Sequence, residues 1–187
     1  MKEKLNLRNI LAWGGALLAI IAFFVCMTAG LKGPTMYEMG ITVDMNLKGL
    51  IIGTQKATVE VPIIGSVTEA LPTVARPTLS LIGIILALVA ALAVVVVSFV
   101  VKDEKTQKII TLVCGIVIVV AAILVLILKS GYISALASKM GVDKEVVKQT
   151  YADLKLNGGA IATAIMLILG GGAVIVSTQS DKVAAKK

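Results

Sequence analysis

The most reactive side chains in this sequence are two cysteines, Cys26 and Cys114, and the chain contains no histidine. Each thiol lies inside a long apolar run, where an isolated cysteine behaves as a small packing residue. Neither has a second thiol or an imidazole nearby in sequence to complete a transition-metal site. A Gly-x-Ser-x-Gly motif and a phosphate-binding loop are also missing from the sequence. The sequence therefore predicts a protein that is not an enzyme, with no catalytic, cofactor-binding or metal-binding residues.

Three consecutive glycines, Gly170, Gly171 and Gly172, lie within the last apolar run, although each costs a helix about 1 kcal/mol relative to alanine. Small residues recur at four-residue spacing in three of the four apolar runs, and examples are Gly15 and Ala19, Gly83, Ala87 and Ala91, and Ala160 and Ala164. In lipid, where apolar burial does not drive helix association, small residues let helix backbones approach closely. We therefore expect these positions to pack helices together. A flexible kink at the glycine triplet that gates a pathway is the alternative.

Four apolar runs contain no Asp, Glu, Lys or Arg and approach or exceed the length needed to cross a bilayer; they cover residues 9–31, 79–101, 109–128 and 158–178. A chain that is 58% hydrophobic has too few polar residues to cover a soluble protein of this length. The sequence thus predicts an all-α membrane protein, with residues 1–187 forming a single four-transmembrane-helix bundle. The first run resembles a signal peptide in its basic start, but it exceeds the roughly 7–15 apolar residues of a signal core.

The basic residues of the short flanking segments predict the orientation of the four spans. Lysine and arginine concentrate before the first span, between the second and third spans, and after the fourth span; they are Lys2, Lys4, Arg8, Lys102, Lys105, Lys108, Lys182, Lys186 and Lys187. Cytoplasmic segments of membrane proteins carry such an excess. We therefore expect both termini in the cytoplasm and two outer loops, residues 32–78 and 129–157. A bacterial cell membrane is the expected location.

The first outer loop contains two segments in which apolar and polar residues alternate, residues 40–49 and 56–65. This period of two is typical of a strand with one covered face. The loop is therefore expected to form a small extracellular antiparallel β-sheet of at least two strands. Its covered face would include Val43, Met45, Val59 and Val61, and we expect these four residues to mediate assembly.

The second outer loop predicts a short amphipathic helix over residues 142–154. Asp143 is its expected N-cap, and Val146, Val147, Tyr151 and Leu154 share its expected apolar face. Together with the preceding residues, this segment has the helix, Gly turn and helix of a DNA-binding repressor module. Its expected position on the outer side of the membrane, and the absence of a third helix, argue against nucleic-acid binding.

The layout of the chain resembles the claudin and peripheral-myelin-protein class of four-span (tetraspan) membrane proteins. The shared features are internal termini, a larger first outer loop with strand patterns and a smaller second outer loop. The resemblance is one of architecture, because that class carries a Trp-Gly-Leu-Trp motif and paired cysteines in a loop that has neither Trp nor Cys here. What the resemblance implies is a non-enzymatic membrane protein that assembles through its outer sheet.

Three functions follow as hypotheses. The first is a structural protein of the lipid bilayer that self-assembles into a homo-oligomer through its outer loops and small-residue helix faces. The second is a subunit of an oligomeric channel or pore whose conduit is lined by Ser, Thr and Gly. The third is an accessory subunit of a transport or secretion complex, whose spans pack against a membrane-protein partner.

Overall fold

The computed structural model describes residues 7–28, 30–34, 41–46, 54–61, 65–72 and 77–179, and within these ranges four helices are long and apolar enough to cross a membrane. These helices are α1 (Leu7–Cys26), α3 (Thr78–Val100), α4 (Glu104–Leu126) and α7 (Gly158–Ser177). Their sequences are rich in β-branched residues, yet a helix is favoured because it satisfies every backbone polar group within one segment in lipid. The four helices confirm the predicted spans and indicate a multi-pass membrane protein.

The bounds of the first span differ from those predicted. Helix α1 ends at Cys26 rather than continuing to Leu31, and the Thr28 hydroxyl donates to the Val25 carbonyl at 2.7 Å where the helix stops. Leu31 is fully buried, but it lies in a strand, β1 (Gly30–Pro34). Hydropathy alone does not distinguish a leucine buried in protein from one buried in lipid, so the predicted span was too long.

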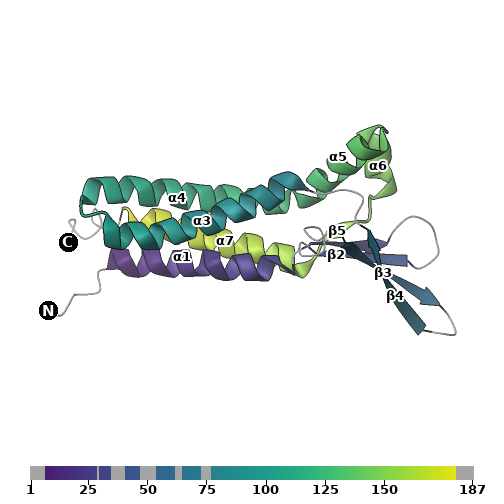
Figure 1. The fold of residues 1–187 in the computed structure, drawn as a ribbon, viewed down its shortest axis with the longest axis horizontal. Coiled ribbons are helices and arrows are strands. Elements are labelled where there is room, and N and C mark those ends of the chain that lie inside the picture. The colour runs from purple at the N-terminus through teal and green to yellow at the C-terminus, as the bar shows by residue number, and fades with distance from the viewer. Residues whose placement is uncertain are drawn as a thin grey trace. The chain divides into compact units, whose positions relative to one another are not determined.

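The chain divides into two compact units. The helix unit comprises Met1–Phe24, Gly83–Ile123 and Thr163–Lys187, and the sheet unit comprises Val25–Ile82 and Leu124–Ala162. Within the helix unit, α1, α3, α4 and α7 lie side by side (Figure 1). Small residues dominate the buried faces of these helices; they include Ala12, Gly15, Ala16, Ala19, Gly83, Ala87, Ala91, Cys114, Gly115, Ala121, Ala164, Gly170 and Gly171. Many large apolar side chains of these helices are exposed instead, as expected of helices that face lipid, although a few, such as Ile118 and Leu167, are buried.

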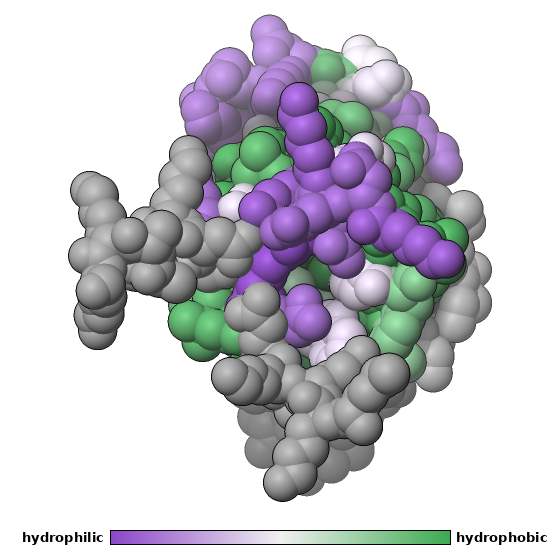
Figure 2. Space-filling model, turned by 90° about the vertical axis from the view of Figure 1, so that its left-hand side faces the viewer, coloured by the Kyte–Doolittle hydropathy of each residue, from purple (hydrophilic) through white to green (hydrophobic). Residues whose placement is uncertain are grey.

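One end of the helix unit is polar. Figure 2 views the end where α1 and α4 begin and shows hydrophilic residues gathered at its centre, with apolar residues around them. Arg8 of α1 donates to Glu104 at 3.0 Å and to Gln107 at 2.8 Å, both on α4. Asp103 accepts bonds from the hydroxyl and the backbone N–H of Thr106, and these bonds hold the pKa of the Asp103 carboxyl below its usual value.

The sheet unit contains a five-stranded antiparallel sheet in the order β4-β3-β2-β1-β5. Besides β1, its strands are β2 (Ile41–Asn46), β3 (Thr54–Val61), β4 (Gly65–Pro72) and β5 (Lys155–Leu156). The two predicted strands correspond to β2 and β3. The sequence also predicts residues 49–55 as the connection between them; Thr54 and Gln55 belong to β3 instead, and residues 49–53 lie outside the described residues. Strand β5 comes from the second loop and pairs with β1, so the two loops form one sheet.

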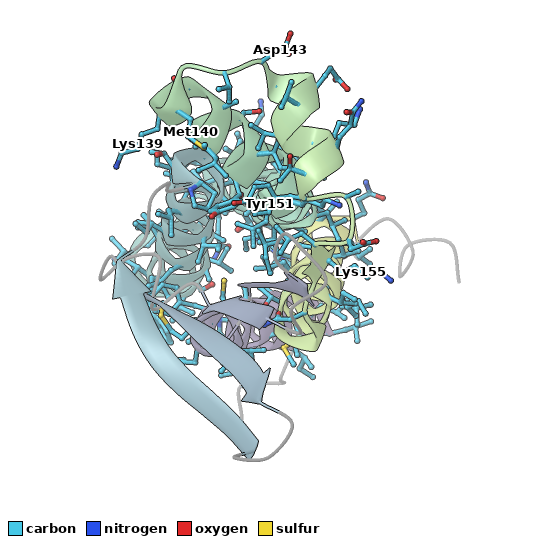
Figure 3. The ribbon with its side chains drawn as sticks, turned by 90° about the vertical axis from the view of Figure 1, so that its right-hand side faces the viewer. Lys139, Met140, Asp143, Tyr151 and Lys155 are labelled. Atoms are coloured by element: carbon cyan, nitrogen blue, oxygen red, sulfur yellow. The ribbon has the colours of Figure 1, made fainter. Side chains whose placement is uncertain are left out.

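Helices α5 (Leu128–Met140) and α6 (Lys144–Thr150) complete the sheet unit. They are joined at Gly141, whose φ of +66° is a conformation that glycine adopts without strain. Figure 3 shows Lys139 and Met140 at the end of α5 and Asp143 at the start of α6. Asp143 is the N-cap and accepts from the Glu145 backbone N–H at 2.9 Å. The loop thus holds the helix, Gly turn and second helix that its sequence predicts.

The apolar face predicted for the second loop is only partly buried. Val147 and Leu154 are buried and Tyr151 is half-buried, whereas Val146 is 56% exposed. Helix α5 contacts β1 and β5, and Leu31, Leu128 and Leu154 are all fully buried in this unit.

Candidate functional site

The closest contact between α7 and α1 lies at Gly170 and Gly15. A Cβ added to Gly170 would stand 2.7 Å from the Gly15 carbonyl oxygen, and a Cβ added to Gly15 would collide with the Gly170 carbonyl oxygen. Backbone therefore faces backbone here, with no room for a side chain on either helix. Such contacts gain van der Waals attraction over a large area, which is what associates helices in lipid.

The next residue of α7 makes an equivalent contact with α4. A Cβ added to Gly171 would stand 2.7 Å from Val119 Cγ2 and 2.9 Å from the Gly115 carbonyl oxygen. A Cβ on Gly115 would in turn meet Ile175 Cγ1 at 2.7 Å and the Gly171 carbonyl oxygen at 3.2 Å. Successive residues of a helix point about 100° apart. Gly170 and Gly171 can therefore contact two different neighbouring helices at the same level.

Gly172 differs from the other two glycines of the triplet, because a Cβ added there would meet nothing within 4 Å. Gly83 and Ala87 of α3 are both buried. The structure thus brings Gly15 and Gly170 together and places Gly171 against Gly115, while Gly172 has open space beside it. Helix α7 is continuous through the triplet.

Gly115 was not predicted as a packing residue from the sequence, although it lies next to a regular stripe of residues on α4. Buried positions of α4 recur every three or four residues and include Thr111, Cys114, Ile118, Ala121 and Val125. Gly115 adjoins this stripe, but the small residues around it do not follow the strict four-residue spacing seen in the other runs. The close contact depends on which helix lies opposite, which spacing alone does not reveal.

A second contact lies in the sheet unit, between the segment that follows α1 and the start of α7, and is centred on Asn157. Its Oδ1 accepts from the backbone N–H groups of Gly30 and Ala160, each at 2.9 Å, and its Nδ2 donates to the Thr28 carbonyl oxygen at 2.8 Å. The Asn157 backbone N–H also donates to the Gly30 carbonyl oxygen at 2.9 Å. One side chain therefore caps the start of α7 and joins it to the segment that follows α1.

Gly159 makes this approach possible. A Cβ added to Gly159 would stand 2.8 Å from Thr28 Oγ1 and 2.9 Å from the Thr28 carbonyl oxygen. The sequence Asn-Gly-Gly before an apolar run is a recognisable N-cap signal. No local sequence pattern predicts that Asn157 bonds to Thr28 and Gly30, which are far away in sequence.

The predicted assembly residues lie on β2 and β3, where the structure describes the backbone. Across β2 and β3, Ile41 pairs with Val59 and Val43 with Ala57; across β1 and β2, Leu31 pairs with Met45. Directly paired residues of antiparallel strands lie on the same face of a sheet. The apolar positions of β1, β2 and β3 are therefore aligned with one another in the register, and Val61 belongs to the same set of positions as Val59. On β4 this set includes Val67 and Leu71 and also Glu69, which pairs with Ala57.

Tyr132 and Tyr151 form an edge-to-face aromatic pair between α5 and the end of α6, with ring centroids 6.5 Å apart. Tyr132 is buried, and this burial, together with the neighbouring Tyr151, raises the pKa of Tyr132 to about 12. The folded protein therefore stabilises the neutral phenol of Tyr132 relative to the phenolate.

Alkaline pH should consequently destabilise the sheet unit through Tyr132. The unfolded chain loses this proton near pH 10, so stability is full below that pH and falls as the pH rises toward the folded-state pKa. We expect a loss of roughly 2 kcal/mol between pH 10 and pH 12. The measurement is the free energy of unfolding of parent and Tyr132→Phe over this range. A decline of equal size in both proteins would contradict the assignment to Tyr132.

Among the described residues, no group of three or more His, Cys, Asp or Glu side chains is arranged to hold a metal ion. The two cysteines are buried and unbridged. No protein-family model matches the chain, and no curated protein matches it in sequence.

Proposed function

We propose that this chain is a non-enzymatic, multi-pass protein of a bacterial cell membrane that self-assembles into a homo-oligomer through its outer sheet. The observation that supports this most is the register of the sheet. Val59 on β3 lies between two apolar partners, Ile41 on β2 and Val67 on β4, while its neighbour Thr58 lies between Thr42 and Thr68. The register thus aligns three apolar residues across the three strands, and three threonines at the next position.

The edge of the sheet at β4 also supports self-assembly. Within the described residues, β4 pairs with β3 alone and ends the sheet, and it is eight residues long. The unpaired backbone groups of such an edge pair readily with a strand of another chain. A second copy of this protein would present the same edge and the same apolar face. The proposal agrees with the resemblance to claudin-like tetraspan proteins.

The proposal is tested by the size of the protein extracted in mild detergent, measured by light scattering during gel filtration. The parent should elute as an oligomer, and Val59→Asp should shift it to monomer, since a charge on a covered face loses its hydration without a partner. Thr58→Asp is the matched control and should leave the oligomer intact. Equal effects of the two substitutions, or a monomeric parent, would contradict assembly through this face.

The same detergent-extracted protein also tests the two alternative functions, an accessory subunit and a channel. A monomer that co-purifies with unrelated membrane proteins would indicate the accessory-subunit role. An oligomer that conducts ions in reconstituted bilayers would indicate a channel.

The orientation that we propose places both ends of the chain in the cytoplasm and the sheet outside. Arg8, Lys102, Lys105 and Lys108 lie at the polar end of the helix unit, and the further lysines near both termini lie outside the described residues. Their positive charge favours retention of this end in the cytoplasm.

Accessibility to an impermeant thiol reagent checks this orientation in intact cells, in a background where Cys26 and Cys114 are replaced by alanine. Cysteines placed at Thr54 and Ser138 should be labelled, and one placed at Thr106 should be labelled only after the cells are lysed. Labelling of Thr106→Cys from outside would reverse the orientation.

A further inference from the structure

An open groove of about 770 Å³ lies in the sheet unit, where α4 ends and α5 and α6 approach each other. Its apolar lining comes from Leu126, Ile127 and Ile133. Leu126 and Ile127 remain 45% and 43% exposed, so the apolar surface is available to a ligand. A groove with this lining suits an aliphatic chain.

The rim of the groove carries an excess of positive charge. Lys129, Lys144 and Lys148 line it together with a single acidic residue, Glu145. Lys148 pairs with Glu145 at 3.3 Å, and Lys129 uses one of its three protons to bond the Ala152 carbonyl oxygen at 2.8 Å. Lys144 makes no ion pair with any residue of the described ranges. The three lysines and one glutamate give the lining a net charge of +2, which suits an anionic group.

The position of the groove along α4 suggests which anion it meets. The charge-free part of helix α4, residues 109–126, corresponds to a length of about 27 Å, which is close to the roughly 30 Å thickness of the hydrocarbon core of a bilayer. Its last residue, Leu126, should lie near the boundary between the acyl chains and the headgroups. The lysine rim, which follows in sequence, then lies at the level of the phosphates.

From this combination of apolar lining, cationic rim and membrane depth, we infer that the groove binds an anionic phospholipid. The phosphate of the lipid contacts Lys144 and Lys148, and the first part of an acyl chain lies over Leu126 and Ile127. A zwitterionic lipid carries its own cation beside the phosphate and gains less from a rim with surplus positive charge. Binding is therefore selective for anionic headgroups, and it does not depend on the oligomeric state of the protein.

Native mass spectrometry of the full-length protein in detergent tests this inference, with phosphatidylglycerol and phosphatidylcholine as the added lipids. The parent should bind phosphatidylglycerol at least fivefold more tightly than phosphatidylcholine. The double variant Lys144→Gln/Lys148→Gln should weaken phosphatidylglycerol binding about 25-fold, since each lysine near an anionic lipid contributes on the order of a fivefold gain in affinity. Both lysines are exposed, so the fold should persist.

The matched control is Lys139→Gln/Lys155→Gln, which removes the same charge from exposed positions of the same unit outside the groove lining (Figure 3). Its phosphatidylglycerol affinity should stay within twofold of the parent. Equal weakening by the two double variants would show attraction to the general charge of the unit and overturn the site. Lack of preference between the two lipids would overturn it as well.

A third pair of variants tests the groove without changing charge. Ala152→Trp fills the groove and should weaken phosphatidylglycerol binding, whereas Val142→Trp places the same side chain at an exposed position outside it. Free glycerol phosphate, added as a competitor, should not displace the lipid, because it lacks the acyl chain. Displacement at comparable concentrations, or unchanged binding in Ala152→Trp, would show that the groove does not take a lipid.

Discussion

Gly171→Leu should prevent the four helices from packing, even though leucine is the better helix former. Its side chain would enter a space where even a Cβ lies 2.9 Å from the Gly115 carbonyl oxygen, so α7 and α4 must separate. We expect a loss of more than about 3 kcal/mol, at the upper end of the cost of overpacking, because the obstacle is backbone that cannot change rotamer. The measurement is the temperature at which the detergent-solubilised protein unfolds, together with the fraction that elutes as folded protein.

Gly172→Leu is the control, since it makes the same change one residue further along the same helix. A Cβ at Gly172 meets nothing within 4 Å. This variant should fold normally and gain up to about 1 kcal/mol from the better helix propensity of leucine. Gly171→Ala should lie between the two. If Gly171→Leu were more heat-stable than the parent, the close packing of α7 on α4 would not support the fold.

Asn157→Ala should produce the second-largest loss. It removes the N-cap of α7, which contributes about 1 kcal/mol, and also leaves the Gly30 N–H and the Thr28 carbonyl oxygen without the bonds that Asn157 gives them. We expect a total loss of about 2 to 3 kcal/mol. Chemical unfolding in mixed micelles, followed by circular dichroism, measures it.

Asn157→Asp separates the cap from the link to Thr28. The aspartate retains an acceptor for Gly30 and Ala160, and its charge is favourable at a helix start. It loses the donor to Thr28, so its stability should lie between that of parent and alanine variant. An aspartate variant as unstable as the alanine variant would mean that the bond to Thr28 dominates. A fully stable alanine variant would contradict the role given to Asn157.

The four spans could be predicted from sequence because a charged residue is costly in the bilayer core, so long runs without charge are distinctive. The sequence patterns of the β-strands were harder to recognise. Strand β4 (Gly65–Pro72) was missed since Glu69 interrupts the alternation of Val67 and Leu71. Strand β1 was hidden at the end of an apolar run. Local patterns identified β2 and β3, but not the pairing that joins β5 to β1.

The sequence predicted that the glycines of α7 pack helices together, but it did not predict which glycine contacts which helix. The glycine triplet was recognisable because three glycines in a helix need an explanation. Which of the three meets a neighbour depends on the rotation of α7 relative to α1 and α4. Gly172 has the same sequence context as Gly171 and the opposite environment. Such differences are set by tertiary packing, which a single sequence does not encode in any short pattern.

The placement of α7 has a consequence for how the protein is made in the cell. Helix α7 is the last of the four spans to be synthesised, yet it carries the partners of Gly15, Gly115 and Thr28. Strand β5, which pairs with β1, immediately precedes it. Earlier spans therefore wait in the membrane with bare backbone surfaces exposed until the final segment leaves the ribosome. During that interval the nascent chain is open to membrane chaperones and to quality-control proteases, and release of the last span ends this exposure.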